Sequence, residues 1–114
     1  PTLLSPSLFR RGVVYGKKKI ERGSAFMKLS FWGAARVVTG SCHRLTACSK
    51  NILIDCGLQQ GGDVYNENEL FFDATAIDAV CVTHAHTDHS GRLPLLVKNG
   101  YKGPIYATRA TCDL

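Results

Sequence analysis

The sequence predicts an α/β domain, a sheet faced by helices, and three observations support this. From residue 27 onward, short strand patterns joined by a tight turn come first and strand-helix-strand patterns follow. One apolar strand pattern leads directly into a cluster of histidines. A chain of 114 residues with 45% apolar content is enough for one small domain with its own core.

The first half of the domain contains a predicted hairpin. A strand that ends at Phe31 is followed by a glycine-alanine loop at 33–35 and by a second strand over 41–47. A turn at 48–51 leads into the apolar run 51–55, which we expect to be a buried, central strand that ends on a carboxylate. Glycines then begin a loop, and residues 63–73 are acidic and irregular. This stretch contains an aromatic pair, Phe71-Phe72, whose rings we expect to pack into the core.

The second half alternates strands and helices. Residues 77–83 form a predicted strand whose C-terminal end carries the histidine cluster. Pro94 suits the first residue of a short helix over 95–98, which Asn99-Gly100 would close. A turn at 102–104, a strand over 105–108 and the capped start of a helix follow. Because that helix stops before it is complete, we expect residues 27–114 to be the N-terminal part of a larger domain, truncated at its C-terminus.

The histidine cluster is the most informative feature of the sequence. His84, His86, Asp88 and His89 fall within six residues, His84-Ala85-His86-Thr87-Asp88-His89, in an H-x-H-x-D-H pattern that directly follows Thr83. Three imidazoles and a carboxylate are nitrogen and oxygen donors that suit zinc and its neighbours. The pattern therefore predicts a metal-binding loop, with these four residues as its ligands.

The spacing of the four donors indicates two pairs. In an extended segment, alternation places His84 and His86 on one side and leaves Asp88 and His89 to the next bend, so that each pair serves one ion. The spacing excludes a helical H-E-x-x-H site, and no thiol lies within the cluster as a zinc finger would require. The alternative is a polar turn whose histidines cap the following helix.

The net positive charge of the chain comes from residues that precede this domain. The net charge is +5, and residues 1–26 contain six basic residues and one acidic residue, whereas eight basic and eight acidic residues cancel from Met27 onward. The leading segment 1–26 shows no sustained periodicity, so we expect a disordered basic extension that precedes the natural start or was added to it. Neither a signal peptide nor a transmembrane span is predicted, and no contact with a membrane is expected.

The five cysteines are odd in number and lack a C-x-x-C pair. We expect reduced, buried thiols in a cytoplasmic protein rather than disulfides or a zinc finger. Cys56 beside Asp55 is a weaker candidate for reaching a metal, against the alternative of simple packing.

The loop from Thr83 to Gly91 resembles the signature loop of the metallo-β-lactamase fold, an αββα sandwich of which this chain would form the N-terminal portion. Further segments resemble the β-CASP branch of that superfamily, which processes RNA. They are Gly33-Ala34-Ala35-Arg36-Val37-Val38-Thr39-Gly40-Ser41, Asp55-Cys56-Gly57-Leu58-Gln59-Gln60-Gly61, Gly91-Arg92-Leu93-Pro94 and Gly103-Pro104-Ile105-Tyr106-Ala107-Thr108. Val37 departs from many relatives of this branch, which carry an acid there.

The resemblance implies specific roles for these residues. His84 and His86 would bind one zinc ion and Asp88 and His89 a second, with Asp88 also assigned a catalytic role. Asp55 would be the strand-end carboxylate that steadies the site, because ligating imidazoles need their other nitrogen fixed by an acceptor; a plain strand-end carboxylate is the alternative. The family's remaining ligands and its inserted β-CASP domain would lie beyond Leu114.

The implied activity is zinc-dependent hydrolysis of RNA phosphodiester bonds by the complete protein, through a metal-bound hydroxide shared by two ions. This chain alone is expected to be inactive. Arg36 and Arg92 are candidates for phosphate contacts, with solvated surface charge favoured for each. The alternatives are hydrolysis of a thioester, lactone or β-lactam on the same scaffold, and a noncatalytic metal-binding partner subunit. RNA is the expected partner, and a homodimer is left open.

Overall fold

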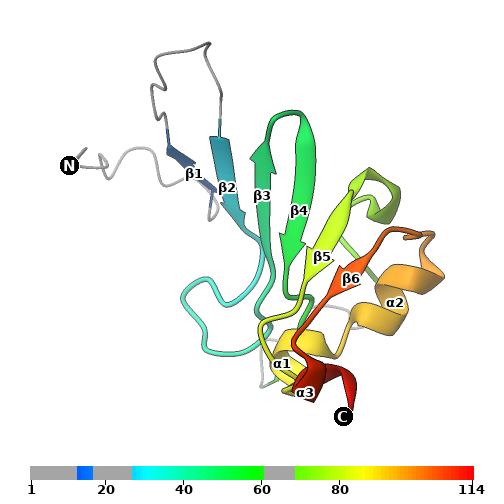
Figure 1. The fold of residues 1–114 in the computed structure, drawn as a ribbon. Coiled ribbons are helices and arrows are strands. Elements are labelled where there is room, and N and C mark those ends of the chain that lie inside the picture. The colour runs from blue at the N-terminus through cyan, green and yellow to red at the C-terminus, as the bar shows by residue number, and fades with distance from the viewer. Residues whose placement is uncertain (1–12, 17–26, 61–68) are drawn as a thin grey trace.

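The computed structural model describes residues 13–16, 27–60 and 69–114. Six strands form one sheet in the order β1-β2-β3-β4-β5-β6, so that neighbours in the chain are also neighbours in space (Figure 1). The strands are β1 (Val13–Gly16), β2 (Met27–Phe31), β3 (His43–Ala47), β4 (Lys50–Ile54), β5 (Ala79–Cys81) and β6 (Ile105–Tyr106). This mixed sheet with helices confirms the predicted α/β class.

Strands β1 to β4 pair in antiparallel fashion, whereas strands β4 to β6 pair in parallel fashion. β2 pairs with β3 and β3 with β4 in antiparallel register, whereas β4–β5 and β5–β6 are parallel pairs. Cys48 and Ser49 join β3 to β4 with φ angles of 50° and 60°, the left-handed conformation that a two-residue hairpin turn of the I′ type needs. β4 is central, as its apolar sequence predicts, and Leu53 within it is fully buried.

The strand β1 lies within the segment that we expected to be disordered. Val13–Gly16 pairs antiparallel with β2, from Val13 opposite Ser30 to Gly16 opposite Met27. β-branched and aromatic residues favour extended backbone, and β2 would otherwise be an open edge. The structure differs from the expectation at these four residues, while 1–12 and 17–26 lie outside the described residues.

The helices are short. They are α1 (Thr87–Ser90), α2 (Leu93–Lys98) and α3 (Arg109–Cys112), together with a 3₁₀ turn, η2 (Ala74–Ala76). Pro94 was predicted as the first residue of its helix, but α2 begins one residue earlier, at Leu93, so Pro94 lies within the first turn. Thr108 caps α3 by accepting from the amide of Thr111, as predicted. The helix α1 and the turn η2 were not predicted, because such short segments have no measurable periodicity. No helix in the described residues is long and apolar enough to cross a membrane.

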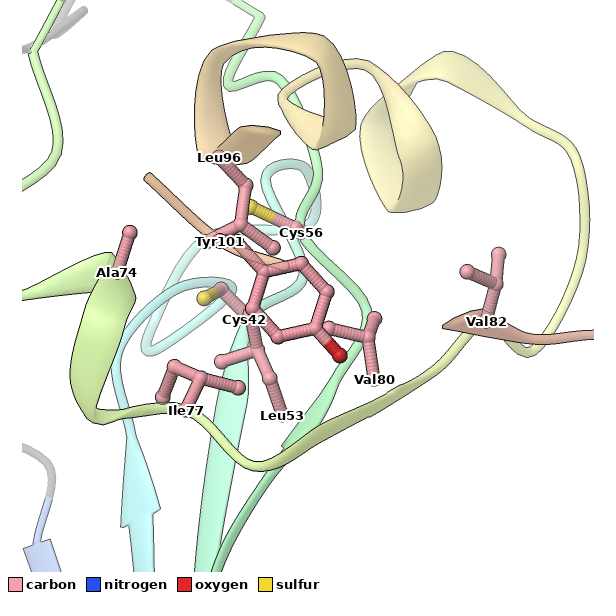
Figure 2. Close-up of a cluster of buried hydrophobic side chains, with 9 residues drawn as sticks. All are labelled: Cys42, Leu53, Cys56, Ala74, Ile77, Val80, Val82, Leu96 and Tyr101. Atoms are coloured by element: carbon pink, nitrogen blue, oxygen red, sulfur yellow. The ribbon is translucent and has the colours of Figure 1, made fainter. Parts of the chain in front are cut away.

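The core lies on the face of the sheet that carries Leu53 and Val80, which are paired across β4 and β5. Leu96 of α2 and Tyr101 pack against them, and Figure 2 shows this group converging. The other members of the cluster are Cys42, Cys56, Ala74, Ile77 and Val82. The opposite face is also apolar: Leu45 and Ile52, paired across β3 and β4, are only half-buried, as expected for part of a larger sandwich.

Two packing predictions need correction. Cys42 and Cys56 are buried, but Cys48, Cys81 and Cys112 are exposed, because Cys48 lies in the hairpin turn and Cys81 alternates away from Val80. Phe72 is half-buried and its ring stacks on Trp32 with centroids 4.6 Å apart, whereas Phe71 is 60% exposed. Only one member of the aromatic pair therefore contributes substantially to the core.

Core burial can be tested with one substitution made at two sites. Val80→Ala removes buried methyl groups and should lower the free energy of unfolding by about 2–3 kcal/mol. Val38→Ala, at a side chain that is 91% exposed, should change it by less than about 0.5 kcal/mol. Denaturant unfolding of both variants measures the difference, and equal effects would contradict this assignment of the core.

Candidate metal centre

The predicted ligands lie together where β5 ends. After Cys81 the chain continues without regular structure to His86, which is the N-terminal boundary residue of α1, so Asp88 and His89 are on that helix while His84 and His86 precede it. The side chain of His86 makes no capping hydrogen bond within the described part of the chain. Capping therefore does not account for His86.

The four side chains form two adjacent pairs. Nε2 of His84 is 3.2 Å from Nδ1 of His86, and Nε2 of His89 is 3.4 Å from Oδ2 of Asp88. The rings of His84 and His89 connect the pairs, with centroids 4.0 Å apart. Among the described residues, no group of three or more His, Cys, Asp or Glu side chains is placed to hold one ion.

Asp55 is the centre of the hydrogen-bond network beneath the histidines. Its carboxylate is only 2% exposed, and Oδ2 lies 2.7 Å from Nδ1 of His89. Thr83 donates its backbone N–H to Oδ1 at 2.7 Å and its hydroxyl to Oδ2 at 2.9 Å, and the hydroxyl of Ser41 donates to Oδ2 at 3.3 Å. A buried carboxylate with this many donors is well satisfied and orients the ring of His89.

The backbone holds the histidine loop against the end of β4. The amide N–H groups of Ser41, Cys56 and Leu58 donate to the carbonyls of Asp88, His89 and Thr87 at 2.8, 2.9 and 3.0 Å. Gly57 lies inside this contact, and a Cβ at that position would come within 1.6 Å of the carbonyl oxygen of Asp88. Only glycine leaves room for so close an approach.

Three residues around Asp55 were not predicted from the sequence. Ser41 and Thr83 hold Asp55, and His43 lies nearby on β3, opposite Ile54. Burial lowers the pKa of His43, the charge of Asp55 opposes this shift and that of His89 adds to it. The Nδ1 atom of His43 is buried without a hydrogen-bond partner among the described residues. The hairpin register, once fixed by the turn at 48–49, could have placed His43 beside Asp55.

Among the described residues, no side-chain hydrogen bond or ion pair joins the other candidates to the four predicted ligands. The thiol of Cys56 belongs to the core and hydrogen-bonds that of Cys42, which lowers the pKa of Cys56 and, together with burial, raises the pKa of Cys42 well above its usual range. Arg36 is exposed. Arg92 is half-buried, and its Nε and Nη2 atoms are buried with no partner in the described residues. Arg92 is thus not the plainly solvated charge that the sequence favoured.

Three relatives show what this chain is similar to. It is 52% identical over 86 residues to ribonuclease TTHA0252 of Thermus thermophilus, covering 75% of this chain and 20% of that protein. It is 43% identical to transcription termination factor FttA of Methanosarcina mazei, covering 78% and 15%, and 35% identical to Integrator complex subunit 11 of Gallus gallus, covering 75% and 16%. The chain therefore spans a fifth or less of the length of these relatives.

Among solved structures, a flavo di-iron protein variant from Thermotoga maritima matches with a TM-score of 0.47 and 17% identity, covering 87% of this chain and 28% of that one.

The family model for the metallo-beta-lactamase superfamily matches residues 35–112, which include Asp55 and all four predicted ligands. Relatives named as a ribonuclease, a transcription termination factor and an Integrator subunit confirm the resemblance to the RNA-processing branch that the motifs indicated. Membership implies a metal cofactor. The chain belongs to the metallo-beta-lactamase superfamily.

Proposed function

We propose that this chain contributes the first half of a two-zinc centre that, in the complete protein, hydrolyses phosphodiester bonds in RNA. The observation that carries the proposal is the gathering of His84, His86, Asp88 and His89 at the end of β5, with His89 oriented by the buried Asp55. None of these four side chains belongs to the apolar core cluster of the described residues.

The donor set fits zinc. Imidazole nitrogens and a carboxylate are common zinc ligands, and the thiolates that would favour softer ions are absent from this cluster of described residues. His84 with His86 would hold one ion, and Asp88 with His89 the other. When bound, such ions polarise a phosphoryl group and lower the pKa of water toward neutrality. Further ligands would come from the part of the protein beyond Leu114.

The residues of this chain prepare the ligands for that role. The short contact between Asp55 and Nδ1 of His89 favours a proton on Nδ1, which leaves the lone pair of Nε2 free for a metal. The hydroxyl of Thr83 lies 2.9 Å from Nδ1 of His84 and constrains that ring in a similar way. Thr83 and Ser41 in turn hold Asp55 in place.

RNA is the proposed substrate because of the relatives' names. Ribonuclease TTHA0252 shares 52% identity with this chain over 86 residues. The loop itself does not choose between phosphodiester, thioester, lactone and β-lactam, since all of these reactions need an activated water and a polarised electrophile. Free cysteines in the described residues fit the proposed cytoplasmic location.

Replacement of a ligand should abolish cleavage. In the complete protein, His86→Ala and Asp88→Asn each remove one donor, and both should leave no detectable metal-dependent cleavage of an end-labelled RNA. The control is Asp113→Asn, which makes the same Asp-to-Asn change at an exposed residue that follows α3. This variant should retain wild-type activity. Undiminished cleavage by either ligand variant would refute the proposed centre.

Asp55 should act on metal affinity without touching the ion. Asp55→Asn keeps the size of the side chain but weakens the acceptor for His89, and it should reduce zinc affinity by about 10–100-fold, as loss of the partner of a ligand typically does. Competition with a zinc-chelating dye measures the change. Asp78→Asn, at an exposed carboxylate that accepts from the amide of Asn51, is the matched control. Equal zinc affinity in the two variants would remove the proposed role of Asp55.

A further inference from the structure

One hydroxyl group lies where the two pairs of proposed ligands meet. Oγ1 of Thr83 is 2.9 Å from Oδ2 of Asp55 and 2.9 Å from Nδ1 of His84. The same oxygen lies 3.5 Å from Nδ1 of His89, on the helix α1. Thr83 is therefore next to one ring of each pair and next to the carboxylate beneath them.

Two hydrogen bonds to Asp55 fix the position of this hydroxyl. The N–H of Thr83 donates to Oδ1 at 2.7 Å and the hydroxyl donates to Oδ2, so Thr83 binds both oxygens of one buried carboxylate. Thr83 itself is exposed and does not belong to the core cluster. The place of the hydroxyl thus follows from Asp55 and not from packing in the core.

A hydroxyl carries a single proton, and this fact determines the form of His84. A carboxylate accepts hydrogen bonds, so the proton of Thr83 is used in the bond to Asp55. Toward Nδ1 of His84 the hydroxyl oxygen can then only accept, and Nδ1 must carry a proton. In this tautomer of the neutral ring the lone pair is on Nε2, which is the atom that lies 3.2 Å from Nδ1 of His86.

The two rings depend on the hydroxyl to different degrees. Nδ1 of His89 lies 2.7 Å from Oδ2 of Asp55 and needs no group between them. Within the described part of the chain, His84 is connected to that carboxylate only through Thr83. Loss of the hydroxyl should therefore release His84 from its tautomer and leave His89 as it is.

We propose that Thr83 is the positioning residue of His84. Its hydroxyl lets Asp55 set the tautomer of a ring that Asp55 does not touch, and so it presents Nε2 of His84 to a metal ion. One carboxylate thereby sets the tautomer of one ligand in each pair. The role in zinc binding rests on the proposed function, whereas the tautomer of His84 does not.

Ring-nitrogen NMR of the complete, metal-free protein tests the tautomer, at a pH where the imidazoles are neutral. The protein is labelled with ¹⁵N-histidine, and the signals are assigned by their loss in His84→Ala and His89→Ala. In wild type we expect the Nδ1–H form of both rings in nearly all molecules. Thr83→Val keeps the shape of the side chain and the backbone N–H but lacks the hydroxyl. It should convert His84 into a mixture of tautomers without changing His89, and Thr83→Ser, which retains a hydroxyl, should match wild type.

Zinc affinity of the same variants tests the consequence. Thr83→Val should bind zinc about 10–100-fold more weakly than wild type, because the partner of a ligand is lost, and Thr83→Ser should restore the affinity. The matched control is Thr46→Val, which removes a hydroxyl that donates to Oδ1 of Asn51 at 2.8 Å. This control should alter neither the rings nor the affinity for zinc.

Three results would overturn the proposal. His84 could keep the Nδ1–H form in Thr83→Val, or both rings could lose it together, which would mean that the substitution acts on the whole loop. Unchanged zinc affinity in Thr83→Val would also contradict it. If wild type bound no zinc at all, the proposed function would fail instead, and the NMR result would still decide the tautomer of His84.

Discussion

The whole site depends on how the chain turns at Asp55. This residue has a φ of 60°, in the left-handed region that costs a non-glycine residue about 1 kcal/mol or more. Regular alternation after Leu53 would direct Asp55 toward the core face, and the turn instead directs its carboxylate to Ser41, Thr83 and His89. The hydrogen bonds that the buried carboxylate accepts offset the strain, since leaving it without them would cost more.

The second constraint is the contact of backbone with backbone at Gly57. Carbonyl groups of the histidine loop accept from the amides of Ser41, Cys56 and Leu58, so backbone hydrogen bonds alone fix the loop to the end of the sheet. Such contacts set the position of α1, whose four residues could not form a stable helix by themselves. The positions of the proposed ligands therefore depend on the end of β4 as well as on β5.

The sequence was a good guide to the elements and to the position of the histidine loop, and a poor guide to the residues that hold that loop in place. Apolar runs and turn residues located the hairpin, the central strand and α2, and the spacing of histidines located the loop. Ser41 and Thr83 carry no such signal, because a hydroxyl gains its role only when the register and the turn at Asp55 bring it to the carboxylate. Cys81 is exposed because successive side chains of a strand alternate between the two faces. The prediction of buried cysteines did not take this alternation into account.

The two pairs of proposed ligands differ in how firmly this chain holds their side chains in place. His89 and Asp88 are 24% and 23% exposed, and His89 is held by a buried carboxylate with three further hydrogen bonds of its own. His84 and His86 rest on Thr83 and on each other, and His86 is exposed. Fixing a ligand in advance removes the entropic cost of ordering it when the ion arrives. In the proposed centre, His89 is therefore preorganised by this chain, whereas His84 and His86 lack a comparable buried partner among the described residues.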